Sequence, residues 1–496
     1  MTILPIMSLK LALKYRFKLL SIIGIAIILC CCTREEVNEA EVIEEKVSVE
    51  PIDFDLANVK KRGSLVAIVD NSSTGYFIYK GQPMGYEFDL LSLFAEHLDV
   101  RLKIEVTTSI GEAFEMLNQG KGDVIAYNLT VTNERKKLAR FTNSHYKTKQ
   151  VLIQRKPEGW RRLTRDQLSN RLIRDQIDLI DQKVYVRKSS AYLPRLKNLA
   201  DEIGGEINIV ETEDSVETEK LIKMVSEGDI DFTVADESVA LVNASYYSNI
   251  DVFTPVSFSQ QIAWAVRNNA NTLLEELNKW LAQIKRQPTY NVVYNKYFNS
   301  PRSSSIRASS DFSSIAGQKI SPYDHLIKPA ADSIGWDWRL LASQIYQESR
   351  FDPKARSWAG AVGLMQLVPE TGRRFGAEAL TDPRQSISAG TGYIRHLDKL
   401  WGKTVKDESE RTKFVLASYN VGLGHVVDAR DLAKKYGGEP DVWDDNVEYY
   451  LLNKSKKKFI NDPVVKFGYC RGEEPVNYVQ EILNRYTQYS QLIASG

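Results

Sequence analysis

The stretch DWRLLASQIYQES, residues 337–349, decides how the last third of the chain folds. Its apolar residues recur at intervals of three and four, as on one face of a helix, and Glu348 continues that face; they are Trp338, Leu341 and Ile345. Asp337 can cap this helix. Burial there disfavours the ionised carboxyl group and raises its pKa, as a general acid near neutral pH requires. On this pattern alone, a structural or outward-facing Glu348 is the better interpretation.

The neighbouring residues favour catalysis instead. QESRFDPKARSWAGAVGLMQLVPETG, residues 347–372, closely resembles the catalytic segment of the lytic transglycosylases with a goose-type lysozyme-like fold. The resemblance implies that Glu348 is the catalyst and that Ser357 hydrogen-bonds to it. It also implies that a GLMQ segment lines the saccharide groove, here Gly363, Leu364, Met365 and Gln366. We expect Gly360 and Gly363 to let the backbone approach a bulky sugar.

Two further motifs of the same family follow in the expected order. FVLASYNVG, residues 414–422, carries Tyr419 and Asn420, which the resemblance places facing the catalytic Glu and the saccharide. Tyr478 in VNYVQEIL matches the tyrosine of the last motif, and a core role is the alternative for both tyrosines. Ser418 stands where the family usually has Ala, which leaves the tyrosine in place. Residues 320–496 are therefore predicted to form a mainly α, lysozyme-like (goose-type) catalytic domain.

The preceding 240 or so residues alternate between strand and helix patterns, which predicts an α/β fold. Strands are expected at LVAIVD (65–70), RLKIEV (101–106), DVIAYNL (123–129), KVYVR (183–187) and DFTVAD (231–236), with a helix at FDLLSLFAEHL (88–98). The order of motifs resembles the periplasmic solute-binding proteins of the amino-acid-binding type. That resemblance implies a two-lobed domain over residues 56–300 that closes on a small ligand.

The same resemblance implies a clamp for a zwitterion. Arg135 would pair with a carboxylate through two parallel hydrogen bonds, and Asp236 would hold an ammonium group. Hydroxyl groups would come from Thr130 and Thr132, and from Ser190 in the second lobe. The alternative is that Arg135 is a solvated surface charge and that the threonines form turns. A retained fold does not guarantee a retained ligand.

The N-terminus has the pattern of a lipoprotein signal peptide, residues 1–32. Basic residues precede an apolar run of about 11 residues, whereas a transmembrane helix needs about 20. Cys32 is the expected lipidation site, with Cys31 as second choice, and thiols in a discarded signal are the alternative. Residues 33–55 read as an acidic flexible tether and residues 301–319 as a Ser-rich linker. The resemblance to the lytic transglycosylases implies that the multidomain chain lies at the periplasmic face of the outer membrane, held by a lipid.

The composition of the chain limits the classes of partner that it is expected to bind. The chain has 65 Lys+Arg against 64 Asp+Glu, so it lacks the basic footprint of a nucleic-acid binder. After processing, Cys470 is the only cysteine expected, which leaves no partner for an intrachain disulfide. The expected partners are peptidoglycan glycan strands and a muropeptide or amino-acid-like effector of the first domain. Neither a metal nor a cofactor is implied.

The resemblance implies a non-hydrolytic cleavage of the β-1,4 bond between N-acetylmuramic acid and N-acetylglucosamine, which leaves 1,6-anhydro ends. A lysozyme-like hydrolase and a non-catalytic peptidoglycan receptor are the alternatives. Most glycosidases use two carboxylates, and no second one is evident here. Asp352 precedes Pro353, where a turn is the better interpretation. Glu348 is therefore expected to act first as acid and then as base.

Overall fold

The computed structural model describes residues 50–300, 303, 306–307, 310–315 and 317–494. Pro51–Gly496 form one compact unit. The predicted signal peptide, with Cys31 and Cys32, and nearly all of the predicted tether lie outside the described residues. Among the helices of the described part, none has both the length and the apolar character that crossing a membrane would need.

The first lobe is built on a mixed sheet of strand order β4-β1-β5-β14-β6, in which β1 is parallel to β4 and β5 and β14 runs antiparallel. Alternate residues of β1 face opposite sides of the sheet. Leu65 and Ala67 pack in the cluster that includes helix α3, whereas Ile68 packs against Phe114 of α4. The elements of this lobe are α2 (Leu56–Arg62), β1 (Ser64–Val69), β2 (Phe77–Tyr79), β3 (Gln82–Met84), α3 (Tyr86–His97), β4 (Arg101–Val106), α4 (Ile110–Asn118), β5 (Val124–Ile125), α5 (Arg135–Leu138), β6 (Arg140–Phe141), β14 (Ala265–Val266), α10 (Asn271–Ile284) and α11 (Pro288–Tyr297).

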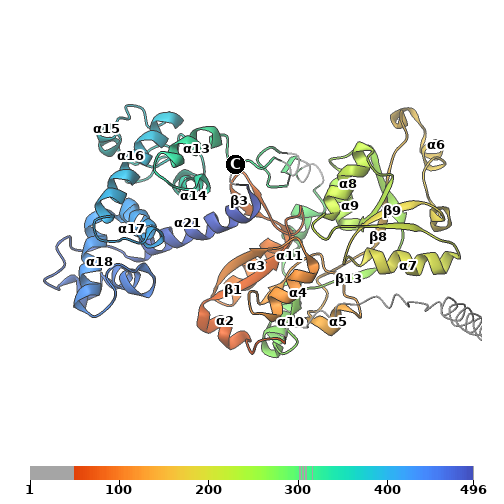
Figure 1. Ribbon diagram of the computed structural model, residues 1–496, viewed down its shortest axis with the longest axis horizontal. Coiled ribbons are helices and arrows are strands. Elements are labelled where there is room, and N and C mark those ends of the chain that lie inside the picture. Colours follow the sequence, from red (N-terminus) through yellow and green to blue (C-terminus); the bar gives the residue numbers. More distant parts are fainter. Residues whose placement is uncertain (1–49, 301–302, 304–305, 308–309, 316, 495–496) are drawn as a thin grey trace, which may run out of the picture. The chain divides into compact units, whose positions relative to one another are not determined.

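The second lobe repeats this plan with the strand order β10-β9-β11-β8-β12. Figure 1 shows α7 on one side of strands β8 and β9 and α8 with α9 on the other. The alternation of β8 explains this, because Val151 and Ile153 pack with α8 and α9 while Leu152 packs with α7. The elements are β8 (Gln150–Arg155), η1 (Trp160–Arg162), α6 (Arg165–Ser169), η2 (Gln176–Leu179), β9 (Lys183–Arg187), α7 (Tyr192–Ile203), β10 (Asn208–Thr212), α8 (Thr218–Glu227), β11 (Phe232–Asp236), α9 (Glu237–Ala244) and β12 (Ile250–Pro255).

The chain crosses between the lobes along two paired strands. β7 (Tyr146–Thr148) leads into the second lobe and β13 (Gln260–Ile262) leads back, and the two run antiparallel. The predicted two-lobed α/β fold is thus confirmed. Polar residues end three of the parallel strands: Asp70 follows β1, Arg187 closes β9 and Asp236 closes β11. In open α/β sheets, ligands bind at these carboxyl ends.

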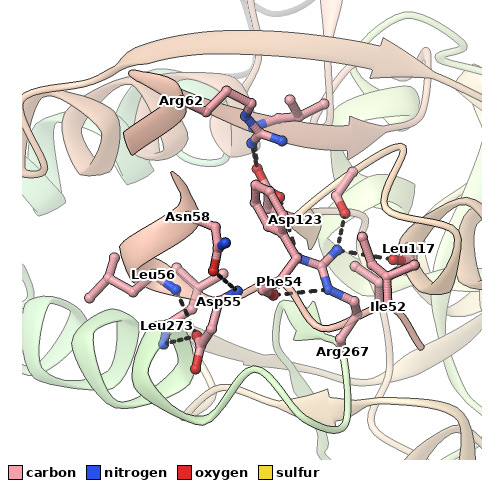
Figure 2. A network of polar contacts seen from close by, with 12 residues as sticks. Ile52, Phe54, Asp55, Leu56, Asn58, Arg62, Leu117, Asp123, Arg267 and Leu273 are labelled. Carbon is pink, nitrogen blue, oxygen red and sulfur yellow. Dashed lines mark hydrogen bonds and ion pairs between the residues drawn. The ribbon is translucent and has the colours of Figure 1, made fainter. Parts of the chain in front are cut away.

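A polar network fixes the start of the first lobe, as Figure 2 shows. The Asp55 carboxylate caps α2 by accepting from the backbone N–H of Leu56, at 2.8 Å, and Asn58 completes a capping box. The same carboxylate accepts from the N–H groups of Thr272 and Leu273, at 3.0 and 2.8 Å. One side chain therefore satisfies the exposed donors of two helix N-termini, α2 and α10.

Arg267 forms the buried half of this network (Figure 2). Its guanidinium, fully buried, donates to the carbonyls of Phe54, Leu117 and Gly122 and pairs with Asp123 at 3.4 Å. Such a group is costly to bury unless each donor finds an acceptor, and this one does. The residues that lead out of the predicted tether are therefore fastened to the lobe at Phe54.

From residue 320 onward, every named element in the described residues is a helix, which confirms the predicted mainly α region (Figure 1). Helix α14 packs against α21, α17 packs against both α21 and α16, and α13 packs against α14. The helices are α13 (Asp324–Asp332), α14 (Trp338–Ser349), α15 (Pro369–Arg374), α16 (Pro383–Trp401), α17 (Glu408–Val421), α18 (Leu423–Lys435), η3 (Trp443–Val447), α19 (Glu448–Asn453), α20 (Lys457–Ile460) and α21 (Glu473–Leu492).

Part of the predicted Ser-rich linker is packed rather than free. The backbone N–H of Lys80 donates to the carbonyl of Phe312 at 2.9 Å, and that of Ile78 donates to Oγ of Ser314 at 3.0 Å, so this piece lies against β2. At the β2–β3 turn, the carbonyl of Gly81 accepts from the hydroxyl of Tyr489 on α21 at 2.6 Å. Hydrogen bonds thus tie this hairpin to the linker on one side and to a C-terminal helix on the other.

Candidate functional site

Glu348 lies in the last turn of α14, as the sequence predicts. Asp337 caps the helix by accepting from the N–H of Arg339 at 2.8 Å. Immediately after the helix, Arg350 and Phe351 both have positive φ, +50° and +64°, a conformation that costs a side chain about 1–2 kcal/mol. The chain therefore turns sharply just beyond Glu348.

Tyr478 on α21 is the hydrogen-bond partner of Glu348. Its hydroxyl donates to Oε1 of Glu348 at 2.5 Å and receives a bond from Nε2 of Gln344 at 3.2 Å. Burial raises the pKa of Glu348 to about 7, against the opposing effect of the Tyr478 hydrogen bond. Glu348 is nevertheless not sealed off, because its side chain keeps partial contact with solvent. It can therefore hold a proton at neutral pH and still meet a substrate.

A pocket of about 350 Å³ opens at this carboxyl group, and Asn420 lines it, as predicted. The whole lining is Gln347, Glu348, Asn420, Glu474, Asn477, Tyr478 and Glu481. The expectation that no second carboxylate accompanies Glu348 is wrong, because Glu474 and Glu481 share its pocket. Helical spacing could have found them, since they lie four residues before and three after Tyr478 on one helix face.

Tyr419 is buried on α17, the helix that also carries Asn420. Burial, and next the charge of Glu348, raise the pKa of Tyr419 well above its ordinary value. The Tyr419 hydroxyl donates to the carbonyl of Met365 at 2.7 Å. Met365 itself is 0% exposed and packs against Gly390. The Met365 side chain is therefore buried while its carbonyl holds Tyr419, and the part of the GLMQ segment at the saccharide groove stays a prediction.

The other residues of this loop mainly hold the loop itself. Nε2 of Gln366 donates to the carbonyls of Ala355 and Gly363, at 3.1 and 2.9 Å. Gly363 has a φ of +84°, and a Cβ on it would lie 1.9 Å from the carbonyl oxygen of Leu380. Protein backbone, rather than an approaching sugar, thus requires glycine at 363.

Ser357 does not make the predicted bond to Glu348 among the contacts of the described residues. Its Oγ accepts from the N–H of Ala361 at 3.0 Å within the same loop, and Tyr478 takes the expected place at Glu348. The Ser357 hydroxyl keeps its own proton to donate, so its role stays a prediction. Asp352 closes a turn by accepting from the N–H of Lys354 at 2.8 Å, as expected.

A second cavity lies between the lobes, at the carboxyl ends of the strands, and Arg135 is one of its walls. Arg135 is only 8% exposed, which excludes the reading as a surface charge. Its Nη1 donates to the carbonyl of Thr130 at 2.9 Å and its Nη2 to that of Ser189 in the second lobe at 3.2 Å. Thr130 lines the cavity, whereas Oγ1 of Thr132 accepts from the N–H of Arg135 at 3.3 Å, at the start of α5, outside the lining.

Ser190 and Asp236 supply unused polar atoms to this cavity. Neither Oγ of Ser190 nor Oδ1 of Asp236 has a hydrogen-bond partner within the described residues. Oδ2 of Asp236 accepts from the hydroxyl of Tyr192 at 3.3 Å. Burial raises the pKa of Asp236 to about 7, against the Tyr192 hydrogen bond and the charge of Arg135. Both atoms are placed to meet a ligand.

The cavity leaves about 60 Å³ for the centres of water-sized molecules. At about 10–15 Å³ for each, four to six such positions fit, which is the scale of a small ligand. Its lining also contains Asp70, Arg187, Glu217 and Glu219, which the sequence analysis missed. The rule that ligands bind at carboxyl ends of strands could have found Asp70 and Arg187.

Comparison with protein families divides the chain in the same way. The model of bacterial extracellular solute-binding proteins, family 3, matches residues 65–300, and that of the transglycosylase SLT domain matches residues 325–442. The second match includes Glu348, Ser357 and Tyr419 and ends before Tyr478.

Two relatives extend the likeness over most of the chain. A membrane-bound lytic murein transglycosylase F of Desulfosudis oleivorans is 34% identical over 87% of this chain and 91% of its own length. A membrane-bound lytic murein transglycosylase F of Pseudomonas fluorescens is 33% identical over 87% of this chain and 85% of its own length. Among solved structures, an ancestral arginine-binding protein bound to arginine matches 48% of this chain and 99% of that chain at 25% identity, with a TM-score of 0.41.

Proposed function

Because this chain belongs to the family of membrane-bound lytic murein transglycosylase F, and is therefore a membrane-associated periplasmic enzyme that cleaves peptidoglycan, we propose that Glu348 is its catalytic acid and base. The observation that carries the proposal is a carboxyl group whose pKa is raised to about 7 by burial at the wall of an open pocket. A group with that pKa can give up a proton and take one back near neutral pH.

The proposed reaction needs Glu348 to donate one proton and then to accept one. Glu348 first protonates the oxygen between N-acetylmuramic acid and N-acetylglucosamine, so that this bond breaks. The resulting carboxylate then takes the proton from the C6 hydroxyl of the muramic acid, whose oxygen closes onto C1. Glu348 ends protonated, no water is consumed, and the product is a 1,6-anhydro end.

The surrounding residues support both steps. The Tyr478 hydroxyl bonds to Oε1 of Glu348 and favours the carboxylate of the second step. Asn420, which lines the same pocket, would offer an amide to the saccharide, and Tyr419 secures the loop after Gly363 through its bond to Met365. Ser357, Gln366 and the backbone of that loop are proposed to border the glycan strand.

Replacement of one residue tests this role. Glu348→Gln keeps the shape of the side chain and removes the titrating group, so release of muropeptides from purified sacculi should fall by about 10³-fold or more. Glu473→Gln, an exposed change on α21, should leave release within two-fold of the unchanged protein. Mass spectrometry of the products separates the alternatives, since hydrolysis adds one water to each new end. Undiminished release by Glu348→Gln would contradict the assignment.

The first domain is proposed to bind an amino-acid-like effector that regulates cleavage. Arg135 and Ser190 would take its carboxylate and Asp236 its ammonium group, and the two unpartnered oxygen atoms in the cavity support this. Lipidation at Cys32, or at Cys31, would hold the protein at the outer membrane through the part of the predicted 33–55 tether that precedes Ile52, since the residues from Ile52 to Asp55 are hydrogen-bonded to the first lobe. The lipoprotein signal pattern and the membrane-bound relatives support this anchor.

A further inference from the structure

The chain between β8 and β9 of the second lobe carries a concentration of positive charge that the proposed function does not use. Residues 155–174, here called the basic segment, contain seven Arg or Lys residues against two acidic ones, whereas the whole chain has a net charge of +1. None of these residues is buried. Figure 1 shows α6, which belongs to this segment, apart from the helices α7, α8 and α9. The charge therefore serves neither the core nor the cavity between the lobes.

The basic segment has a fixed place along β12, the edge strand of this sheet. Nζ of Lys156 donates to the carbonyl of Ser248 at 2.9 Å, and Nη2 of Arg161 donates to Oγ of Ser248 at 3.0 Å. Further along, Arg174 holds the Asp251 carboxylate through two hydrogen bonds of 2.6 and 2.9 Å. The segment is thus fastened to residues just before β12 and within it, so its remaining charges are presented at one edge of the lobe.

Three arginines of the basic segment are free to bind a ligand. Arg162, Arg165 and Arg171 are exposed, and their side chains make no hydrogen bond or ion pair within the described part of the chain. Nearby, the guanidinium of Arg161 lies 4.7 Å from the ring centre of the half-buried Trp160. A guanidinium binds phosphate through two parallel hydrogen bonds, and Trp is enriched where membranes meet water. The chemistry of the segment therefore suits a surface of phosphate groups.

Exposed apolar side chains follow the same edge of the lobe. Phe253, in β12 itself, is 68% exposed, and Phe258, three residues beyond the strand, is 83% exposed. Ile177 is 53% exposed and follows Gln176, whose Nε2 donates to the carbonyl of Pro255 at 2.8 Å. One exposed apolar side chain is ordinary, whereas three along one edge beside a basic segment indicate an interaction surface.

We propose that this edge of the second lobe docks on a membrane surface that contains anionic phospholipids. The basic segment together with Ile177, Phe253 and Phe258 is called the docking edge below. Phosphate headgroups would pair with its arginines, and the boundary of the acyl chains would take up its phenylalanines. A glycan strand offers carboxylates but no apolar medium, so it would leave both phenylalanines in water.

The docking edge would act together with the proposed lipid anchor. A lipid on the N-terminus would keep phospholipids at a high effective concentration near the protein, so a surface of modest affinity would stay bound. Two points of attachment would also fix which side of the second lobe faces the membrane. The inference itself depends neither on the anchor nor on the assigned roles of Glu348 and Arg135.

Vesicle binding without the anchor tests the proposal. A protein of residues 33–496 lacks the predicted lipidation site and retains the whole compact unit, Pro51–Gly496. Sedimentation should show at least ten-fold tighter binding to phosphatidylethanolamine vesicles with a quarter of phosphatidylglycerol than to vesicles with phosphatidylcholine in its place. The preference should shrink in about 0.5 M NaCl, because salt screens exposed charges. Equal binding to the two kinds of vesicle would overturn the proposal.

A pair of exposed arginines tests the basic part of the docking edge. Arg162→Gln combined with Arg165→Gln should weaken binding to the anionic vesicles at least ten-fold, since each arginine near such a surface contributes about five-fold. Arg384→Gln combined with Lys399→Gln removes the same charge from exposed positions of α16 and should stay within two-fold of the unchanged protein. An arginine pair that binds as tightly as this control would contradict the proposal.

A second pair tests the apolar part. Phe253→Ser combined with Phe258→Ser should weaken binding about ten-fold or more, because two aromatic side chains no longer leave water on docking. Val292→Ser changes a 65% exposed apolar residue of α11 and should have no effect. Urea midpoints equal to that of the unchanged protein would show that each variant is folded. Undiminished binding by the phenylalanine pair would reduce the contact to charge alone and overturn the docking edge.

Purified sacculi separate the membrane from the cell wall as the partner. The arginine pair should bind sacculi as the unchanged protein does, because the docking edge is proposed to contact lipid. Weaker binding to sacculi together with unchanged binding to vesicles would assign the basic segment to peptidoglycan and overturn the proposal.

Discussion

Two opposing effects meet at Glu348, and burial is the larger of the two. Burial favours its neutral form, while the Tyr478 hydroxyl, at 2.5 Å, favours its carboxylate, and the resulting pKa is about 7. In the proposed mechanism a group poised there serves both proton transfers, while Glu474 and Glu481 line the same pocket. Tyr478 would then set the pH range of the reaction as well as the position of the carboxyl group.

Tyr478→Phe should move this range upward. Loss of the donor removes an effect that lowers the pKa of Glu348, so that pKa rises, and the fall in activity at alkaline pH should shift upward by about one unit. The rate at the optimum should drop about ten-fold, because a hydrogen bond to a charged group is lost. The measurement is muropeptide release as a function of pH. Tyr486→Phe, the same change on the same helix with Asp337 as partner, should leave the profile in place, and an unshifted profile for Tyr478→Phe would contradict the argument.

Sequence predicted the residues whose position follows from helical spacing and missed those whose position depends on loop geometry. Asp337 and Glu348 lie where the periodicity puts them. The burial of the Met365 side chain, the φ of +46° at Gln366 and the close approach of Gly363 to the carbonyl of Leu380 were not predicted. Non-local contacts of this kind leave no period in a sequence.

In the first domain, some predicted strands have the observed bounds and one is shorter than predicted. RLKIEV and KVYVR form strands over the predicted ranges, as β4 and β9. Within DVIAYNL only Val124–Ile125 pair as β5, since the following residues leave the sheet to line the cavity and the Tyr127 hydroxyl donates to the carbonyl of Thr107 at 2.6 Å. The predicted strand is therefore shortened where it begins to serve the site.

The polar network of Figure 2 predicts how much Arg267 contributes to the stability of the first lobe. Arg267→Met leaves Asp123 buried without its buried partner and deprives three carbonyls of a donor, so the free energy of unfolding should fall by about 3–5 kcal/mol. Urea unfolding followed by tryptophan fluorescence measures it. Arg62→Met, which removes a partly exposed partner of the same Asp123, should cost about 1 kcal/mol. A loss below 1 kcal/mol for Arg267→Met would show that the network is not a structural anchor.

The whole molecule keeps several carboxyl groups protonated at neutral pH. Burial first of all raises the pKa of Glu217 to about 8 and the pKa values of Asp236 and Glu348 to about 7. The unfolded chain releases these protons near its ordinary pKa values of about 4, so the folded state binds more protons than the unfolded state. Stability from these groups is complete at low pH and is lost as pH rises through 7 and 8.

Ligand-free protein should therefore lose stability between pH 6.5 and pH 8.5, by about 3 kcal/mol in total, since each group contributes at most about 1.4 kcal/mol per pH unit. Urea midpoints at the two pH values test this. Burial lowers the pKa of His145 to about 3. This group therefore makes the protein more stable as pH rises, but mainly below its ordinary pKa of 6.5. It does not mask the predicted loss of stability above pH 6.5. Glu217→Gln should reduce the loss by about a third or more, and stability that rises across this range would contradict the linkage.

Arg135 joins the lobes through the carbonyls of Thr130 and Ser189, one on each side. The carboxylate of the proposed effector would compete with the Ser189 carbonyl for this guanidinium, and parting of the lobes would free Arg135 to bind it. Ser189 would then act as an internal competitor of the proposed effector. The observed rate of effector association would then reach a maximum equal to the rate at which the lobes open, instead of rising with effector concentration. The response time to a pulse of effector would be set by this opening rate and not by the effector concentration.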